Sequence, residues 1–337
     1  MRRNVVFIGI ALLLLLLLFM LDLALGSVRL PIAEVLGALF GSSADNALAS
    51  SIVTGFRLPK AIAAVLAGGA LSVSGLLMQT VFRNPLAGPY VLGISSGASL
   101  GVAVVVLGAS ALGLGYWAGQ LGVVLAALMG AMLVLLLIMA VSVRVRDIMT
   151  ILILGMMFGS AASAITSILQ FFSDESALKS YVLWTMGSVS GVSGPRLLLF
   201  AGIVVLGLLL AQLLARPLDV LNLGESYAKT LGYNIMGVRF MVFLSTSLLA
   251  GSAAAFCGPI GFIGLAVPHI VKLLLRTSRH ALLMPATLLA GADVLLLCDL
   301  LAQLPGSDLV FPINSVAALM GIPIVIYVVF NNKRIAS

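Results

Sequence analysis

The sequence predicts an all-helical membrane protein that forms a single domain over residues 1–337, with about ten transmembrane helices. Three observations predict this fold. Apolar residues make up 62% of the chain, and charged residues make up only 9%, against about 25% in a typical soluble domain. Apolar stretches of about 20 residues, the length that crosses a bilayer, recur along the chain. Because lipid offers no partner to an exposed backbone amide, we expect these stretches to be helical.

Ten spans are predicted from the apolar stretches, of which the third and eighth are short and interrupted by glycine. The first span also resembles a signal peptide, but its apolar run from Val5 to Leu21 is longer than the usual apolar region of such a peptide, which favours an uncleaved span. The predicted spans are Val5–Leu25, Ala61–Phe82, Tyr90–Leu107, Trp117–Val141, Ile148–Phe172, Leu197–Leu214, Val238–Phe256, Ile260–Leu275, Leu282–Leu304 and Pro312–Phe330.

The basic residues orient the spans, because cytoplasmic loops carry an excess of lysine and arginine. With both chain ends inside, 13 of the 18 basic residues fall on the inner side. These are Arg2, Arg3, Arg83, Arg144, Arg146, Arg216, Lys229, Arg239, Lys272, Arg276, Arg279, Lys333 and Arg334. The outer side carries Arg29, Arg57, Lys60, Lys179 and Arg196. The net charge of +7 therefore needs no nucleic-acid partner.

Small residues recur at helical spacing in three spans, which predicts close helix packing in lipid. The fifth span differs, because its stripe of small residues continues into polar ones. A polar stripe of this length predicts a water-accessible path. The stripes are Gly68, Ser72 and Gly75; Gly93, Gly97 and Gly101; and Gly155, Gly159, Ser163 and Ser167, continued by Thr166 and Gln170.

An internal repeat relates the second and seventh spans. Residues 66–75 read LAGGALSVSG and residues 249–258 read LAGSAAAFCG, with five of ten positions identical. The two spans are predicted to run in opposite directions. This pattern indicates an inverted-topology repeat of spans two to five and seven to ten, which is typical of transporters.

The sequence contains no recognisable catalytic or metal-binding motif. No Gly-Lys dipeptide occurs, so the chain has no phosphate-binding loop of the Walker A type. Cys257 and Cys298 lie in apolar runs and are expected to be core residues. Asp293 and Asp299 fall inside the ninth span, where a carboxylate is either functional or paired near a helix end.

The longest inner loop, residues 216–237, lies between spans six and seven. Glu225 and Lys229 are four residues apart, the favourable order on a helix, and Gly232 is a plausible stop. Tyr227 and Ala228 belong to an apolar face of this short helix. Such a helix either lies on lipid or binds a partner. A partner is favoured, because the loop is nearly neutral.

Three stretches resemble the FecCD-type permeases, the membrane subunits of bacterial ABC importers for iron–siderophore complexes, haem and cobalamin. The resemblance runs from about residue 50 to the C-terminus. It rests on RLPKAIAAVLAGGALSVSGLLMQTVFRNPLAGPYVLGISSGASLG (residues 57–101), GPIGFIGLAVPHIVKLLL (residues 258–275) and LNLGESYAKTLGYN (residues 221–234).

The resemblance implies a permease of the bacterial inner membrane that is not itself an enzyme. It would pair with a second permease subunit, as a homodimer or heterodimer, and with two ATPase subunits, which would hold the ATP and magnesium. No cofactor is expected on this chain. A periplasmic or lipid-anchored binding protein would deliver the cargo. The predicted ATPase contacts are Leu221, Leu223, Gly224, Glu225, Tyr227, Ala228, Lys229, Leu231 and Gly232.

The resemblance also implies roles at both ends of the path. Arg57 and Lys60 match outer basic positions that pair with the binding protein, which predicts exposed basic groups, although interfacial lysines and arginines also extend toward water without such a role. Gln303 stands where cobalamin permeases of the family have a third basic residue. The cytoplasmic gate would include Asn84, Leu86, Ile148 and Met149, and the path itself Gly155, Gly159, Ser163, Ser167 and Gln170.

The leading hypothesis is therefore an ABC importer permease for a metal chelate, with a ferric siderophore as the first choice of cargo. An ion-coupled secondary transporter that uses Asp293 and Asp299 is the alternative, supported by the inverted repeat and the intramembrane carboxylates. A membrane scaffold without transport is a third hypothesis, against which the polar stripe on the fifth span argues.

Overall fold

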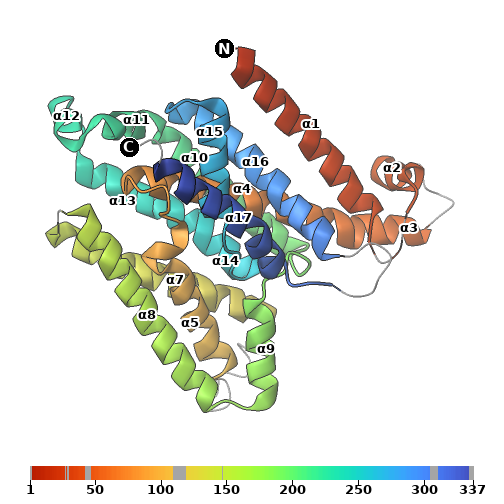
Figure 1. The fold of residues 1–337 in the computed structure, drawn as a ribbon. Helices are drawn as coiled ribbons and strands as arrows, with labels where there is room; N and C mark the ends of the chain where they lie inside the picture. The colour runs from red at the N-terminus through yellow and green to blue at the C-terminus, as the bar shows by residue number, and fades with distance from the viewer. Residues whose placement is uncertain are drawn as a thin grey trace.

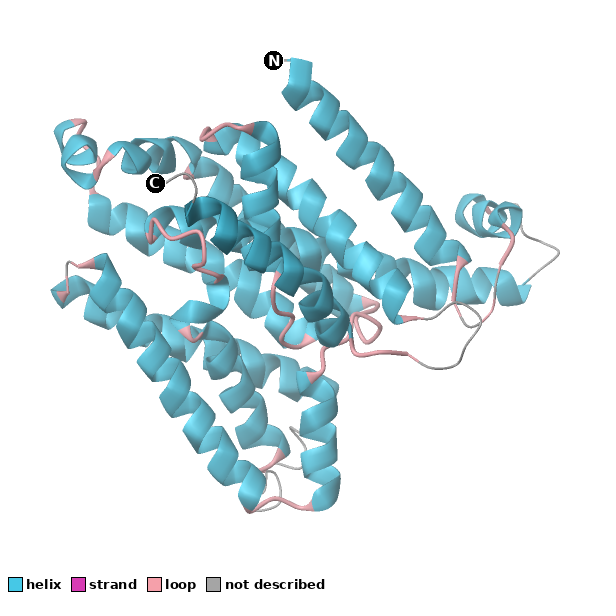
Figure 2. Ribbon diagram, in the orientation of Figure 1, coloured by secondary structure: helices cyan, strands magenta, loops and turns pink. Residues whose placement is uncertain are grey.

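The computed structural model describes residues 2–26, 28, 30–41, 47–108, 119–145, 147–303 and 310–333. Within these ranges the chain is helical, with no strand, which confirms the predicted fold class (Figures 1 and 2). Five predicted positions lie outside the described residues, namely Arg29, Trp117, Arg146, Leu304 and Arg334.

Seven helical stretches are long and apolar enough to cross a membrane. They are Arg3–Ala24, Ala47–Val81, Gln120–Ser142, Ile148–Phe171, Pro195–Leu213, Ile235–Cys257 and His280–Ala302. In order, they belong to α1 (Arg2–Ala24), α3 to α4 (Ala47–Ile52, Leu58–Val81), α7 (Gln120–Arg144), α8 (Ile148–Phe171), α10 (Pro195–Leu213), α13 to α14 (Ile235–Thr246, Ser252–Cys257) and α16 (His280–Ala302).

Three further apolar helices lie where the third, eighth and tenth spans are predicted. They are α5 (Ile94–Val106), α15 (Ile263–Leu275) and α17 (Ile313–Lys333). Helices α5 and α15 have only 13 residues each, fewer than the roughly 20 that cross a bilayer. The structure therefore corrects the starts of both spans. Instead of Tyr90 and Ile260, the helices begin at Ile94 and Ile263, each after a residue with positive φ, Gly93 or Phe262.

Short helices cap the two ends of the bundle. Helices α11 (Ala215–Leu223) and α12 (Glu225–Thr230) lie at the end that also holds the start of α1, the upper left of Figure 1. We call this the inner end. Helices α2 (Ile32–Phe40) and α9 (Glu175–Thr185) lie at the opposite, outer end.

Helix α4 forms the centre of the bundle. In its most apolar window 83% of the residues are buried, against 11% in α1, whose leucines face outward. A helix that is apolar on all sides is expected at the core of a membrane bundle or against lipid. The predicted glycine stripes explain the central position of α4, because they let neighbouring backbones approach it closely.

The glycines of α4 touch the backbones of α15 and α16. A Cβ atom at Gly75 would lie 1.6 Å from the carbonyl oxygen of Gly264, and one at Gly68 would lie 2.2 Å from that of Gly291. Helices α5 and α7 meet in the same way, because a Cβ at Gly97 would lie 2.5 Å from the carbonyl oxygen of Gly130. No side chain fits at these crossings, so they require glycine.

The two halves of the chain pack reciprocally, as an inverted repeat predicts. Helix α4 of the first half packs on α15 and α16, whereas the α13 to α14 segment of the second half packs on α5 and α7. The end of α4 lies beside α11 at the inner end, and α13 begins there, directly after α12. The two repeat-bearing helices therefore run in opposite directions.

We predict that Gly75→Ala destabilises the protein by about 1–3 kcal/mol, the usual cost of overpacking, because the new methyl group would overlap the Gly264 carbonyl group. The measurement is thermal unfolding in detergent. Gly202→Ala is the matched control, since nothing lies within 4 Å of a Cβ at Gly202 of α10. Equal melting temperatures for the two variants would contradict the close approach of α4 and α15.

Candidate functional site

The predicted coupling segment folds as two short helices that meet at a sharp break. Gly224 separates α11 from α12 with φ 128° and ψ 145°, a conformation that is essentially restricted to glycine. Helix α12 then ends at Thr230, and Gly232 follows with φ 82°. The predicted stop at Gly232 is confirmed. The two glycines fix the path of the backbone, so the tip of the segment has a defined shape.

The coupling segment exposes large apolar side chains at its tip. Leu223, Tyr227 and Leu231 are 69%, 50% and 53% exposed. Lys229 and Gly232 are exposed as well, and Gly224 and Glu225 are half-buried. Apolar groups at the end of a membrane bundle that are neither in the core nor along the spans are a candidate contact surface for a partner.

Two residues predicted to contact a partner are buried in this chain, so the prediction is wrong for them. Leu221 and Ala228 belong to the core of this chain, so their side chains hold the two short helices onto the bundle and are not available to a partner. Glu225 pairs with Arg239 of α13, at 2.5 Å, rather than with Lys229 as the four-residue spacing predicts. A tertiary partner has replaced the local one.

Polar contacts tie the coupling segment to three spans. Asp219 of α11 accepts hydrogen bonds from the backbone amide of His280, at 2.8 Å, and from Nδ1 of the same residue, at 2.6 Å. It thereby caps the first turn of α16 from another helix. The other ring nitrogen, Nε2, is hydrogen-bonded to the Thr80 hydroxyl group of α4 at 2.8 Å. Arg83 donates to the Leu221 carbonyl group at 2.7 Å.

The predicted gate residues lie at the same end. The Asn84 side chain accepts a hydrogen bond from the Leu86 amide at 2.9 Å, which shapes the turn that follows α4, and Leu86 is exposed. Ile148 is half-buried and Met149 is exposed in the first turn of α8. Asp147 caps this turn, and the hydrogen bonds that it accepts from the hydroxyl group and the amide of Thr150 lower the pKa of its carboxyl group.

The predicted path residues on α8 separate into two groups. Gly155 and Gly159 are buried against the backbone of residues 91–93, so their part in the structure is close packing and the prediction that they line a path is wrong. Ser163, Ser167 and Gln170 line a cavity of 360 Å³. The full lining is Ser95, Ser96, Ser99, Ser163, Thr166, Ser167, Gln170, Tyr181 and Pro259.

The lining of this serine-rich cavity is polar but carries no charged residue, histidine or cysteine. The buried hydroxyl group of Ser95 makes no hydrogen bond within the described chain. A buried hydroxyl group without a partner is costly, so water or a solute is expected to satisfy it. Sequence reasoning missed the three serines of α5, although each lies within two residues of a glycine of the Gly93, Gly97 and Gly101 stripe.

At the outer end, the expectation of exposed basic groups is wrong. Lys60 and Arg57 are each only 8% exposed. The Lys60 ammonium group lies 2.7 Å from Asp299 of α16 and 3.5 Å from Asp22 of α1. Gln303 donates to both carboxylates, at 2.9 and 3.0 Å. These four side chains form an outer charge cluster that joins α1, α4 and α16.

Arg57 holds the end of α1. Its guanidinium group donates to the carbonyl oxygens of Leu23, at 2.8 Å, of Ala24, at 3.0 Å, and of Val28. Leu23 and Ala24 are the last two residues of α1, where carbonyl groups have no partner within the helix, and Val28 lies just beyond it. A role of Arg57 or Lys60 in binding a second protein stays a prediction, because both groups are engaged within the chain.

The two intramembrane carboxylates differ. Asp299 is paired with Lys60 near a helix end, which is the structural alternative of the sequence analysis. Asp293 lies six residues before Asp299 in α16, is buried, and has one carboxylate oxygen without a hydrogen-bond partner in the described chain. Within the described chain no group of three or more histidine, cysteine, aspartate or glutamate side chains could hold a metal ion.

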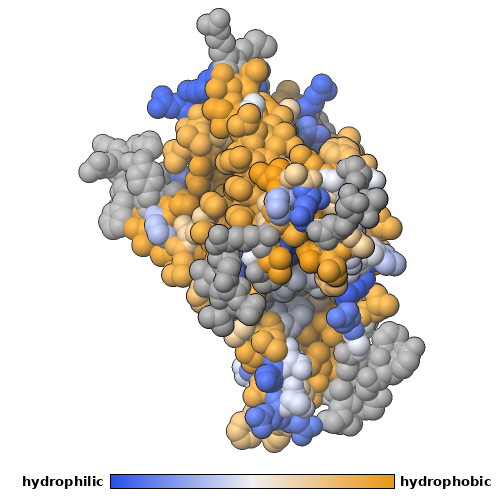
Figure 3. Space-filling view, turned by 90° about the vertical axis from the view of Figure 1, so that its right-hand side faces the viewer, coloured by the Kyte–Doolittle hydropathy of each residue, from blue (hydrophilic) through white to orange (hydrophobic). Residues whose placement is uncertain are grey.

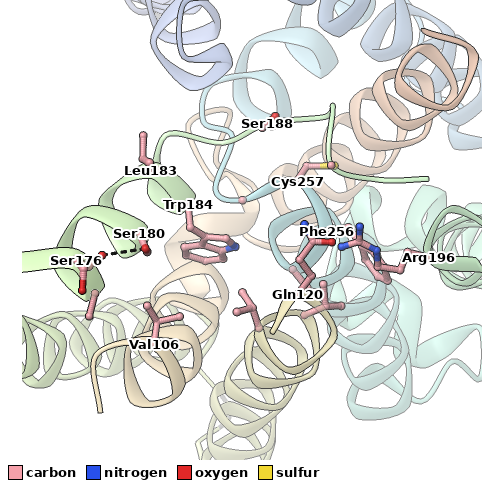
Figure 4. Close-up of a pocket in the computed structure, with 16 residues that line it drawn as sticks. Val106, Gln120, Ser176, Ser180, Leu183, Trp184, Ser188, Arg196, Phe256 and Cys257 are labelled. Carbon is pink, nitrogen blue, oxygen red and sulfur yellow. Dashed lines mark hydrogen bonds between the residues drawn. The ribbon is translucent and has the colours of Figure 1, made fainter. Parts of the chain in front are cut away.

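A second cavity, of 720 Å³, lies beside α9 and shares no residue with the serine-rich cavity. Trp184 projects from α9 toward Phe256 and Gln120, and Arg196 of α10 lies beyond Phe256 (Figure 4). None of the predicted site residues lines it. Its walls include the last turn of α5 and the first turn of α7, which flank residues 109–118 outside the described chain.

We predict that Lys60→Met lowers the free energy of unfolding by about 3–5 kcal/mol, since it leaves two neighbouring carboxylates buried without their cation. Thermal unfolding in detergent is the measurement. Lys179→Met, on the exposed surface of α9, is the control and should change the melting temperature little. A melting temperature of the Lys60 variant that equals that of the control would show that the outer charge cluster does not hold the three helices together.

Comparison with known proteins places the chain among transport proteins. Residues 14–331 match the FecCD transport family. The chain is 34% identical over 326 residues to the uncharacterised ABC transporter permease protein YvrB of Bacillus subtilis, covering 93% of this chain and 90% of YvrB. It is 37% identical over 280 residues to the vitamin B12 import system permease protein BtuC of Salmonella paratyphi A, covering 82% and 83% of the two chains.

A solved structure has the same fold. It is described as an inward-facing conformation of an ABC transporter proposed to be of the metal-chelate type. The TM-score is 0.82 at 28% identity, over 97% of this chain and 99% of that one. Because the family match spans nearly the whole chain and both relatives agree with it, the protein belongs to the FecCD transport family.

Proposed function

We propose that the chain is the membrane-spanning permease subunit of an ABC importer and carries a metal chelate across the bacterial inner membrane into the cytoplasm. The observation that carries this proposal is the coupling segment. It offers exposed apolar groups at its tip and is tied by polar contacts to α4, α13 and α16. A chain without a phosphate-binding loop needs such a surface to receive energy from a separate ATPase.

The proposed ATPase contact is the tip formed by Leu223, Tyr227 and Leu231, with Lys229 at its edge. Two ATPase subunits would each hold one such tip. Nucleotide-driven closure would move the tip, and the contacts of Asp219, Arg83 and Glu225 would carry the movement into the spans. A ligand changes a conformational equilibrium only through contacts that differ between the states, so a rigid tip suits this role.

The proposed path runs along α8. Its polar side chains face a cavity rather than a packed neighbour, and Ser163 and Ser167 are exposed in the single chain. A second permease subunit, identical or related, would cover this face. The inner gate would then lie at Asn84, Leu86, Ile148 and Met149, where the first turn of α8 and the turn after α4 both expose apolar groups.

The proposed cargo is a ferric siderophore. The lining of the serine-rich cavity offers hydroxyl and amide groups and no histidine, cysteine or methionine side chain that could ligate haem iron. Vitamin B12 import by the BtuC relatives makes a cobalamin the second choice of cargo. A binding protein on the outer side would deliver the chelate, and both chain ends would be cytoplasmic, as the distribution of basic residues predicts.

Reconstitution tests the proposal directly. The permease is placed in vesicles with its ATPase subunits, and uptake of an iron-labelled siderophore is followed with the binding protein outside and ATP inside. Uptake should require ATP and all three components, and should continue after the proton gradient is collapsed. Accumulation by the permease alone, driven by a cation gradient and lost in Asp293→Asn, would instead establish the ion-coupled alternative.

We predict that Tyr227→Asp uncouples the transporter. A carboxylate placed in an apolar contact costs several kcal/mol when it lacks a partner, so ATP-driven uptake should fall at least about tenfold. The fold should persist, because Tyr227 is half exposed. The ratio of ATP hydrolysed to cargo transported is the measurement. Tyr227→Phe keeps the ring and should behave as the parent. Unchanged uptake in Tyr227→Asp would remove the partner role from the tip.

We further predict that Thr80→Val and His280→Asn each raise the ATP hydrolysed per cargo transported. The first removes the hydroxyl group that His280 contacts, and the second keeps a donor toward Asp219 but loses the contact with Thr80. Because both break the same link, the double variant should resemble either single one.

The control for this pair is Ser245→Ala. It deletes another buried interhelical hydrogen bond, from Ser245 to the Gly207 carbonyl group at 2.9 Å, near the far end of α13. It should cost stability of about 1 kcal/mol without changing the ratio. A change in the ratio with Ser245→Ala, or none with Thr80→Val, would show that the Thr80 to His280 contact is structural only.

A further inference from the structure

Three arginines converge on a cleft at the inner end of the bundle, outside every site described above. The cleft has a volume of 710 Å³ and lies between the start of α1, the end of α15 and the start of α16. Its lining is Arg3, Asn4, Val5, Leu275, Arg276, Thr277, Arg279, Ala281 and Leu282. The lining thus combines three arginines with four apolar residues and two uncharged polar ones.

The positive charge of the cleft is not neutralised by the described chain. No carboxylate lines it, and no ion pair to Arg3, Arg276 or Arg279 occurs within the described residues. Asp219 accepts hydrogen bonds from His280, the residue that follows Arg279, and is engaged there rather than in the cleft. Three uncompensated cations in one cleft attract an anion.

The backbone holds the arginines in place. Arg3 donates to the carbonyl group of Leu275, which belongs to the last turn of α15. Arg276 adopts φ 48° and ψ 45°, a left-handed conformation that is uncommon outside glycine. Arg279 directly precedes the first residue of α16. The spacing between the three guanidinium-bearing positions is therefore set by three helix ends rather than by a mobile loop.

The apolar part of the cleft continues onto the surface of α1. Val5 is exposed in the cleft, and the exposed residues Leu12, Leu13, Leu16 and Leu17 follow it along α1. Figure 3 views the molecule from the right-hand side of Figure 1 and shows a largely apolar upper half, with hydrophilic groups at its top and a smaller hydrophilic group near the middle. A soluble anion would make no use of this apolar extension, whereas a lipid would use both parts.

We propose that the cleft binds an anionic phospholipid, with the headgroup phosphate among Arg3, Arg276 and Arg279 and an acyl chain along α1. Basic pockets between transmembrane helices on the cytoplasmic side suit anionic headgroups, and each basic residue near the surface contributes to their attraction. The lipid belongs to the leaflet that the coupling segment faces. The site goes beyond the proposed transport function and does not depend on the cargo.

The test titrates lipids onto the delipidated full-length chain in its purified transporter complex, with binding read by native mass spectrometry. Phosphatidylglycerol should bind more tightly than phosphatidylcholine. Replacing one arginine should weaken phosphatidylglycerol binding about fivefold, and the double variant R276Q/R279Q about 25-fold. R276G is a second probe. Glycine accepts the left-handed backbone at this position, so a loss of lipid affinity in R276G cannot be attributed to backbone strain.

R216Q is the matched control, because Arg216 is an exposed inner-end arginine of α11 that does not line the cleft. It should leave the affinity within about twofold of the parent. Equal binding of the two lipids, or an equal loss in R216Q, would overturn the proposal. Displacement of the lipid by glycerol 3-phosphate at the same concentration would also overturn it, since a soluble anion would then be the ligand. None of these readouts requires transport.

Discussion

The contact between α4 and α16 is the interaction on which the rest of the structure depends. The two backbones touch at Gly68 and Gly291, and the Ser72 hydroxyl group reaches the Thr287 carbonyl group at 3.0 Å in the middle of the crossing. In lipid, helices do not associate to escape water, so close backbone contact and interhelical hydrogen bonds must hold them together. Polar contacts at both ends reinforce the crossing, Thr80 with His280 inside and Lys60 with Asp299 outside.

This arrangement connects the two surfaces of the membrane. Asp219 caps α16 from the coupling segment, and Asp299 near the other end of α16 belongs to the outer charge cluster. A displacement of the coupling segment therefore acts on a pair of helices that is closely packed along its length. The polar side chains of α8 stand outside this pair, where they are free to line a path. The proposed function thus assigns rigid packing and permeation to different helices.

The sequence predicted the site unevenly, and the errors share a cause. Gly232, the exposed tip at Tyr227 and the polar part of α8 followed from local pattern, since each depends on neighbours within one helix. Ala228, Gly155 and Lys60 were misjudged because their surroundings come from other helices. The order of the spans places Lys60 at the outer surface, where an exposed side chain is expected. Only the approach of α1 and α16 brings two carboxylates to it. The three serines of α5 were missed for the same reason.

Composition and periodicity by themselves determined that this chain is a helical membrane protein and where its apolar segments lie. These properties depend on hydrophobic length and local spacing, which a linear sequence contains in full. Tertiary structure decided which small residues pack and which line a cavity, and which charges are paired. Those outcomes depend on contacts between segments far apart in the chain, such as Asp219 with His280 or Asp22 with Gln303, and no local pattern encodes them.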